Sequence, residues 1–293
     1  MPPTLSPGVR RVVMTGAGVP LSALLAGPVH GPPRATVVAL HGGGMSAGYF
    51  DGQAHPDVSL MTLAARLGYA VLSVDRPGYG LSAARLPEGR TLAEQSRALR
   101  AALQHYFLHH EAGAGFLLLA HSYGGKLAFT AAAQVGDGEA PVPGAELLGL
   151  DVSGCGHQRA AVPERGAGSE GREPWTRAWG ALRLYPPGTF RASTALVSPM
   201  PERERLDVLR WPAVFPSVAG RVRVPVRLTF AEHEAWWRHD DAAVEDLRSH
   251  LAAPRVVVDR APDAGHNISL GWAARAYHLK ALAFLEECLA GRA

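Results

Sequence analysis

The chain of 293 residues is 47% hydrophobic and 19% charged, which is enough apolar content to build one full core with an elaboration. Its formal net charge is +3, and the basic residues, nearly all of them arginine, are dispersed, so we expect no nucleic-acid partner. No segment has the length of a transmembrane span and the first residues lack the features of a signal peptide, so we expect a cytoplasmic protein with no membrane partner. Two cysteines are too few for a disulfide framework, and we expect both to be reduced.

Strand-like apolar runs alternate with helical periodicity along most of the chain. The expected strands cover residues 11–14, 21–25, 37–41, 71–75, 117–120, 147–152, 224–230 and 256–259. The expected helices cover residues 60–67, 92–107, 126–134, 242–251 and 272–289. This alternation favours an α/β fold, with a mainly parallel central sheet flanked by helices on both faces.

Residues 154–220 break the alternation. The segment is rich in Pro, Gly and Arg. It also carries scattered aromatic side chains, namely Trp175, Trp179, Tyr185, Phe190, Trp211 and Phe215. We interpret it as an insertion into a core domain made of residues 1–153 and 221–293. For any single one of these rings, packing within a small subdomain is the simpler interpretation.

A candidate nucleophile, Ser122, follows the apolar run 117–120 and precedes Tyr123, Gly124 and Gly125. A strand that turns at once into a helix holds a serine in a strained corner with its hydroxyl exposed, and small neighbours let that corner form. The helix N-terminus then directs backbone N–H groups at whatever the serine attacks. The pattern predicts nucleophilic catalysis, and an accidental small-residue turn after a buried strand is the alternative.

Three further segments also consist of a strand followed by a loop. Residues 37–44 end in a glycine loop, residues 71–82 run into a Gly/Pro turn, and residues 255–267 place His266 on a loop after a strand. Together with the Ser122 segment, and in this order, they resemble the α/β-hydrolase superfamily over nearly the whole chain. The resemblance implies that superfamily's fold.

The resemblance also implies that residues 154–220 form a cap over the nucleophile, inserted after the sixth core strand. Aromatic side chains on such a cap line an apolar substrate cavity. We expect substrate-binding side chains at Trp175 and Trp179 of this cap. We also expect them at His41 and Trp236, which lie outside the cap.

The chemistry of a serine nucleophile needs two more groups. An imidazole must take the hydroxyl proton, and a carboxylate must hold that imidazole in the right tautomer. Ser122 is the expected nucleophile, and His266 supplies the imidazole. Glu234, a few residues past an expected strand, matches the family's acid position, with glutamate in place of the commoner aspartate. Glu232 and Asp151 are the alternatives for the acid.

The resemblance further implies an oxyanion hole made by backbone N–H groups. One donor is Tyr123, directly after the nucleophile, and the other belongs to the loop after His41, with Gly43 as first candidate and Gly44 as the alternate. Donors of this kind stabilise the negative charge that develops in the transition state.

The sequence predicts neither a metal nor an organic cofactor. The histidines include a neighbouring pair and several near acidic residues, among them His157, but none has the His-Glu-x-x-His spacing of a zinc helix. No glycine-rich phosphate loop follows a strand in the dinucleotide-binding pattern. Cys155, near His157, does not follow a turn of the Ser122 kind, which argues against a cysteine nucleophile.

The sequence thus predicts a serine hydrolase that cleaves a carboxylic ester or thioester through an acyl-enzyme on Ser122. Residues 41–44 resemble the lipase and esterase branch of the superfamily, whereas residues 75–82 resemble the branch of epoxide hydrolases, dehalogenases and cofactor-free perhydrolases. Epoxide hydrolases and dehalogenases attack with a carboxylate, so the serine favours acyl transfer.

The expected partner is a small-molecule acyl substrate with a sizeable apolar acyl group. A biosynthetic thioesterase or acyl transferase would use the same acyl-enzyme. The alternatives are a ligand-sensing receptor with little turnover, a cofactor-free perhydrolase and a C–C bond hydrolase.

Overall fold

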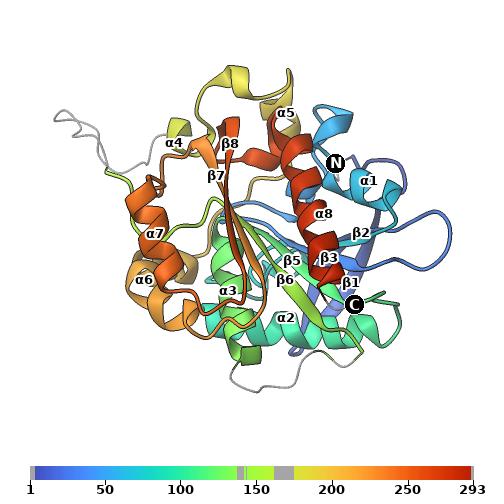
Figure 1. Ribbon diagram of the computed structural model, residues 1–293. Coiled ribbons are helices and arrows are strands. Elements are labelled where there is room, and N and C mark those ends of the chain that lie inside the picture. Colours follow the sequence, from blue (N-terminus) through green and yellow to red (C-terminus); the bar gives the residue numbers. More distant parts are fainter. Residues whose placement is uncertain (1–3, 137–141, 143, 162–174, 292–293) are drawn as a thin grey trace.

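The computed structural model describes residues 4–136, 142, 144–161 and 175–291, and a twisted eight-stranded sheet runs through its centre (Figure 1). The strands are β1 (Arg10–Gly16), β2 (Val19–Ala26), β3 (Thr36–Leu40), β4 (Ala70–Val74), β5 (Phe116–His121), β6 (Leu147–Ser153), β7 (Val226–His233) and β8 (Val256–Gly265). They lie in the order β1-β2-β4-β3-β5-β6-β7-β8. All neighbouring pairs from β4 to β8 are parallel, while β2 pairs antiparallel with both β1 and β4. The predicted α/β class with a mainly parallel sheet is confirmed.

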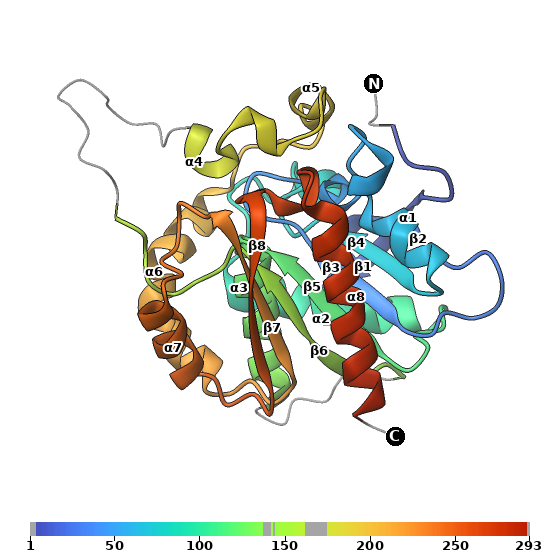
Figure 2. The same cartoon turned by 45° about the horizontal axis from the view of Figure 1, so that its top comes forward.

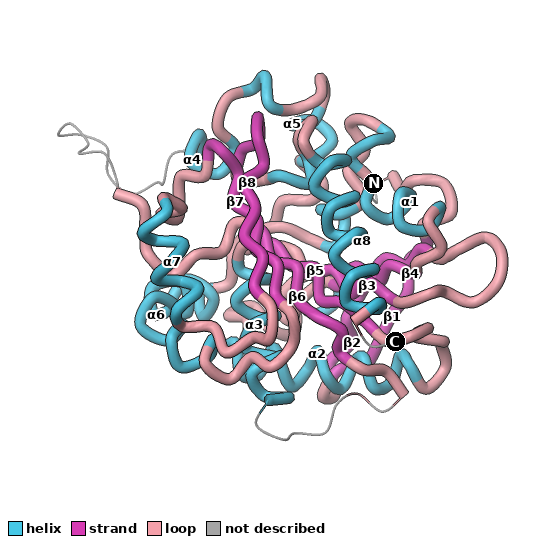
Figure 3. The backbone as a smooth tube through the Cα atoms, in the orientation of Figure 1, coloured by secondary structure: helices cyan, strands magenta, loops and turns pink. Residues whose placement is uncertain are grey.

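Helices cover both faces of the sheet (Figure 3). They are α1 (Leu60–Arg66), α2 (Leu92–Phe107), α3 (Tyr123–Gly136), α4 (Trp175–Trp179), α5 (Thr189–Ser193), α6 (Glu202–Ala219), α7 (Asp241–Ser249) and α8 (Ala274–Ala290). Side chains of α1 and α8 pack on one face, and those of α2, α3, α6 and α7 pack on the other. Within the described ranges, no helix is long and apolar enough to cross a membrane.

The sequence of α2 dictates both its bounds and its orientation. Thr91 and Glu94 form a capping box, in which each side chain accepts a hydrogen bond from the other residue's backbone N–H. Leu99, Ala102 and Leu103 are buried on one stripe that faces the sheet. The predicted range 92–107 is confirmed.

Helix α3 begins at Tyr123, three residues before the predicted start at residue 126. Gly124 and Gly125, which precede the predicted helix, belong to its first turn. A Cβ on Gly124 would lie 2.3 Å from the backbone oxygen of Leu40. Glycine is required there because the helix starts directly against the end of β3.

The segment between β6 and β7 has two parts. Helices α4 and α5 lie beyond the carboxyl ends of the parallel strands, above the body of the molecule (Figure 2, yellow). Helix α6 instead packs into the core, where Trp211 and Phe215 are fully buried and the Phe215 ring lies 5.6 Å from that of Phe129 on α3. The predicted insertion therefore includes one helix that belongs to the core.

Helix α6 was not predicted because Pro212 and Pro216 lie inside it. Proline has no N–H, so the carbonyl of Val208, four residues before Pro212, loses its helical donor. The guanidinium of Arg159 donates to that carbonyl instead, at 2.7 Å. The helix thus continues past the proline while a side chain from outside replaces the missing hydrogen bond.

Candidate active site

Ser122 lies between the end of β5 and the start of α3, at the edge of the sheet where the parallel strands end. Its φ is +53°, a left-handed value that non-glycine residues adopt at a cost. Backbone hydrogen bonds on both sides hold the strained turn. The Ser122 N–H donates to the carbonyl oxygen of Ser153 at 2.8 Å, and the Gly125 N–H donates to the carbonyl oxygen of Ser122 at 3.0 Å. The backbone has the sharp strand-turn-helix form that the sequence predicts.

Loops after β7 and β8 bring an acid and an imidazole to the same edge. His266 Nε2 lies 3.1 Å from Ser122 Oγ, and His266 Nδ1 lies 2.7 Å from Glu234 Oε2. The other oxygen of Glu234 accepts the N–H of Trp236 at 2.9 Å. The structure therefore joins Ser122, His266 and Glu234 in one hydrogen-bonded chain.

The two alternative acids lie elsewhere. Asp151 is buried and accepts hydrogen bonds from Arg227 at 2.6 Å and from the Tyr277 hydroxyl at 3.1 Å. Glu232 is exposed and accepts the N–H of Asp263 at 2.8 Å. Neither carboxylate contacts His266, so only Glu234 has the geometry expected of the acid.

The environment of Glu234 favours its ionised form. Burial alone raises the pKa of this carboxyl, but the charge of His266 and the hydrogen bonds from His266 and the Trp236 N–H outweigh it, and the pKa lies below its usual value. The carboxylate therefore stays charged at neutral pH and holds the proton of His266 on Nδ1.

Gly154, the first residue of the predicted insertion, makes room for this arrangement, although the sequence predicted no role for it in the site. Its φ is +59°, and a Cβ there would lie 2.8 Å from Cε1 of His266. Any other residue at this position would push the ring away from Ser122. A glycine directly after a buried strand was the available signal.

The oxyanion candidates differ in their hydrogen bonding. The N–H of Gly44 donates to the Tyr79 hydroxyl at 3.0 Å, so it is engaged. Within the described part of the chain, the N–H groups of Gly43 and Tyr123 have no acceptor. Both residues line the same cavity as Ser122. Two backbone donors are thus available beside the serine, and Gly43 rather than Gly44 is one of them.

A buried ionic network that sequence reasoning missed holds the glycine loop. Arg76 is 1% exposed; it donates to the carbonyls of His41 at 2.9 Å and Gly42 at 3.1 Å, and forms an ion pair with Glu204 of α6. The Tyr79 hydroxyl, which accepts from Gly44, donates to the same Glu204 at 2.7 Å. This network ties the loop after β3 to α6. The stretch 75–82 resembled another branch of the superfamily, and nothing in it indicated this contact.

Two of the predicted substrate-binding residues do not line the cavity. The ring of His41 is fully buried; its Nδ1 lies 2.8 Å from the Gly42 oxygen and its Nε2 accepts the N–H of Arg76 at 3.2 Å. Trp179 packs against the rings of Tyr185 and Phe190, at 5.4 and 5.1 Å. Both rings fill packing space and not the cavity wall, and a contact of His41 or Trp179 with substrate stays a prediction.

The third predicted residue, Trp236, does line the cavity, and its ring lies 6.2 Å from that of His266. Trp175 begins α4, but its side chain lies outside the described part of the structure.

The cavity over Ser122 has a volume of about 340 Å³. Its apolar wall comes from methionine, valine, leucine and tryptophan side chains, namely Met45, Met200, Val208, Leu209, Trp236 and Trp237. Lys126, Arg159 and Arg205 also line it. A cavity of this size and polarity suits a small organic molecule.

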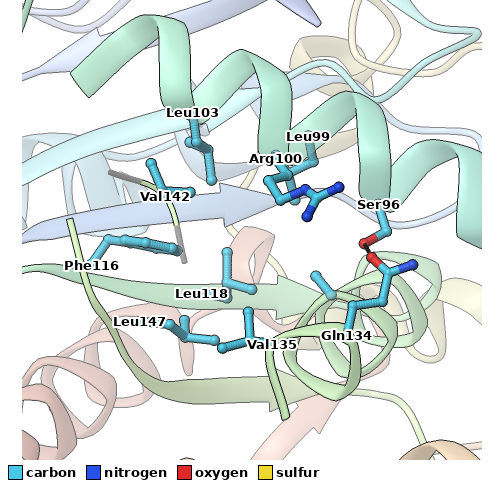
Figure 4. A pocket seen from close by; sticks show the side chains of 11 residues that line it. Ser96, Leu99, Arg100, Leu103, Phe116, Leu118, Gln134, Val135, Val142 and Leu147 are labelled. Carbon is cyan, nitrogen blue, oxygen red and sulfur yellow. Dashed lines mark hydrogen bonds between the residues drawn. The ribbon is translucent and has the colours of Figure 1, made fainter. Parts of the chain in front are cut away.

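A second cavity, of about 40 Å³, lies between α2, α3 and the sheet (Figure 4). Leucine, valine and phenylalanine side chains form most of its wall, and the Ser96 hydroxyl is hydrogen-bonded to Gln134 at 2.5 Å.

Elsewhere, ligand atoms of His157, Asp246 and His250 lie within 4.8 Å of one another, but His157 and Gln158 already form hydrogen bonds to Asp246, at 2.5 and 2.8 Å. Neither place includes a residue of the Ser122 cavity.

Solved structures with the same fold include several enzymes. A monoacylglycerol lipase from Paleococcus ferrophilus is 18% identical with a TM-score of 0.64, over 92% of this chain and 99% of that chain. A thermophilic esterase from Thermogutta terrifontis is 16% identical with a TM-score of 0.61, over 95% and 99%. An N-acyl homoserine lactonase is 13% identical with a TM-score of 0.63, over 96% and 97%. At these identities the likeness shows a shared fold.

The sequence itself carries the family signal. No curated protein matches the chain. The model of the alpha/beta hydrolase family matches residues 37–277, which run from β3 into α8 and include the Ser122, Glu234 and His266 loops. Because this match covers most of its length, the chain belongs to the alpha/beta hydrolase family.

Proposed function

We propose that the protein hydrolyses carboxylic esters or thioesters through an acyl-enzyme on Ser122. The observation that carries this proposal is the hydrogen-bonded chain from Ser122 Oγ through His266 to Glu234, with distances of 3.1 and 2.7 Å. Such a chain supplies the base and the orienting acid that a serine hydroxyl needs at neutral pH.

In the first half of the reaction, Ser122 Oγ attacks the substrate carbonyl while His266 Nε2 takes its proton. Glu234 keeps the Nδ1 proton in place and stabilises the imidazolium that forms. The backbone N–H groups of Tyr123 and Gly43 bind the oxyanion, and each such donor is worth about 3 kcal/mol in the transition state. The imidazolium then protonates the leaving alcohol or thiol, and the acyl-enzyme remains.

In the second half, His266 removes a proton from water as the water attacks the acyl carbon, and it then returns that proton to Ser122 Oγ as the acid leaves. An alcohol or amine in place of water would make the same site an acyl transferase. The segment with α4 and α5, beyond the sheet edge that carries Ser122, is proposed as the cap that shields this chemistry. The lipase, esterase and lactonase with the same fold all act on ester bonds, which supports the proposal.

Labelling with a fluorophosphonate, which reacts with activated serines, tests the nucleophile directly. Wild-type protein should label and Ser122→Ala should not, while both give the same melting temperature. Acyl esters and acyl thioesters of graded chain length then define the bond and the acyl group. Tight ligand binding without labelling would contradict the proposal and favour a ligand-sensing receptor.

A further inference from the structure

Lys126 is a buried cation in the wall of the Ser122 cavity. It lies in the first turn of α3, four residues after Ser122, and it is 1% exposed. Lysine is almost never fully buried unless it is paired with an acid. Its position beside the nucleophile therefore needs an explanation beyond packing.

No carboxylate of the described residues lies within ion-pair distance of Lys126. Its Nζ lies 3.8 Å from the Cys155 sulfur and 4.7 and 5.6 Å from the ring centroids of Trp237 and Trp211. A thiol is a weak acceptor, and the two rings compensate only part of the cost of burying a charge. Burial, together with the charge of Arg159, lowers the pKa of Lys126, although the Cys155 contact and Glu234 oppose this shift. Among the described residues, the amine therefore lacks an anionic partner.

The Asp, Glu, Lys and Arg residues that line the cavity within the described part of the chain are all positively charged. Arg159 and Arg205 line the same cavity, and no Asp or Glu is among its described lining residues. The Arg159 guanidinium lies 5.8 Å from the centroid of the Trp237 ring, the ring that also lies beside Lys126. Glu234, the nearby acid, is already bonded to His266 and the Trp236 N–H. The cavity therefore contains an excess of positive charge close to the proposed nucleophile.

We propose that the natural substrate is an ester or thioester that carries a carboxylate, and that Lys126, with Arg159, binds this carboxylate while Ser122 attacks the ester carbonyl. This inference rests on the proposed function and names its substrate class. A carboxylate brings the anionic acceptor that the buried ammonium lacks. Arg159 donates to the Val208 carbonyl through Nη2, and its other N–H groups are the ones that can bind the carboxylate. The apolar side chains of the wall then contact the carbon chain between the two groups.

Matched ester pairs test the charge preference on each side of the scissile bond. On the acyl side, the 4-nitrophenyl monoester of glutarate is compared with 4-nitrophenyl pentanoate. On the alcohol side, 4-acetoxybutanoate is compared with butyl acetate. We expect wild-type protein to prefer the charged member of one pair, and the pair that responds identifies the side that carries the carboxylate.

Lys126→Met should reduce kcat/KM for the preferred charged ester about 10- to 100-fold, the range of a hydrogen bond to a charged group. It should reduce kcat/KM for the neutral partner much less, so that the ratio of the two values falls. The matched control is Lys280→Met, which removes the only other lysine, at an exposed ion pair with Asp259. It should leave both values unchanged. Equal losses on charged and neutral esters, or a wild-type preference for the neutral ester in both pairs, would overturn the proposal.

Inhibition of the wild-type protein decides the matter if Lys126→Met fails to fold. Glutarate should inhibit hydrolysis of 4-nitrophenyl pentanoate competitively, and the neutral glutaramide should not. Equal inhibition would overturn the carboxylate site. If no ester is turned over and no fluorophosphonate reacts, the proposed function fails by itself, and calorimetric binding of glutarate to Ser122→Ala still tests Lys126.

Discussion

The cavity under α2 and α3 and the cavity over Ser122 differ in size, place and chemistry. The small one, about 40 Å³, lies between the sheet and helices α2 and α3, where Ser96 and Gln134 are hydrogen-bonded to each other (Figure 4). The large one, about 340 Å³, lies where the parallel strands end and loops from several of them meet. Voids between packed elements are imperfections of the core, whereas the carboxyl edge of such a sheet is where α/β proteins bind ligands. Substitutions at the large cavity should therefore change turnover, and substitutions at the small cavity should change the free energy of unfolding.

The largest effect should follow from Ser122→Ala. Removal of the hydroxyl should reduce ester turnover by about 10⁴- to 10⁶-fold, since the nucleophile has no substitute. The melting temperature should stay near that of the wild type because only one exposed oxygen is lost. Steady-state hydrolysis of a 4-nitrophenyl ester and a thermal melt check both statements. A variant that keeps more than a tenth of wild-type turnover would remove Ser122 from the reaction.

Glu234→Gln should have the next largest effect. An amide keeps the shape but favours the wrong tautomer of His266, and the expected loss in kcat is about 10⁴-fold. The matched control is Glu232→Gln, two residues earlier in the chain and exposed, which should keep full turnover. Similar losses in both variants would show that the loop, and not the acid at 234, matters.

Leu103→Ala should change stability and leave activity alone. Leu103 is 2% exposed on α2 and lines the small cavity, so truncation enlarges an existing void. The expected loss in the free energy of unfolding is about 2–5 kcal/mol. Urea unfolding gives this value, and kcat/KM at a temperature where the variant is folded should match that of the wild type. A selective loss of activity in the folded variant would mean that the two cavities are coupled.

The smallest effect should come from Tyr79→Phe. Without the hydroxyl, Gly44 and Glu204 each lose one hydrogen bond, and the glycine loop is held less firmly beside Ser122. A net loss of about 1 kcal/mol corresponds to a five- to tenfold decrease in kcat/KM. The decrease should appear mainly in kcat, because the loop supports the transition state more than the bound substrate. An unchanged kcat would show that the loop keeps its position without Tyr79.

Local patterns predicted most of the fold. The helix 92–107 was predictable because Thr91 and Glu94 cap it and its apolar stripe is regular. The end of β8 was not, because the predicted strand 256–259 continues to Gly265 through a proline and a register shift against β7, neither of which is typical of a strand. Helix α6 was missed because tertiary packing of Trp211 overrides its two prolines.

Candidate site residues could be predicted only where a reactive residue type stands in a loop directly after a strand. Ser122 and His266 follow strands in recognisable loops. The resemblance placed Glu234 ahead of Glu232 and Asp151. Which of the three carboxylates contacts His266 depends on the positions of β6, β7 and β8 relative to one another, which no local pattern contains. The rings of His41 and Trp179 are buried and do not line the cavity, and the sequence could not predict this because a buried ring and a substrate-facing ring have the same sequence signal.

Pro212 links a backbone position to the side chain of Arg159. The proline leaves the Val208 carbonyl without a helical donor, and Arg159 occupies that carbonyl at 2.7 Å. Any residue other than proline at 212 restores an N–H, which competes with Arg159 for the same acceptor. Residues 159 and 212 should therefore vary together among relatives. A library that redesigns the cavity should randomise them as a pair, although only Arg159 is among the described residues that line the cavity.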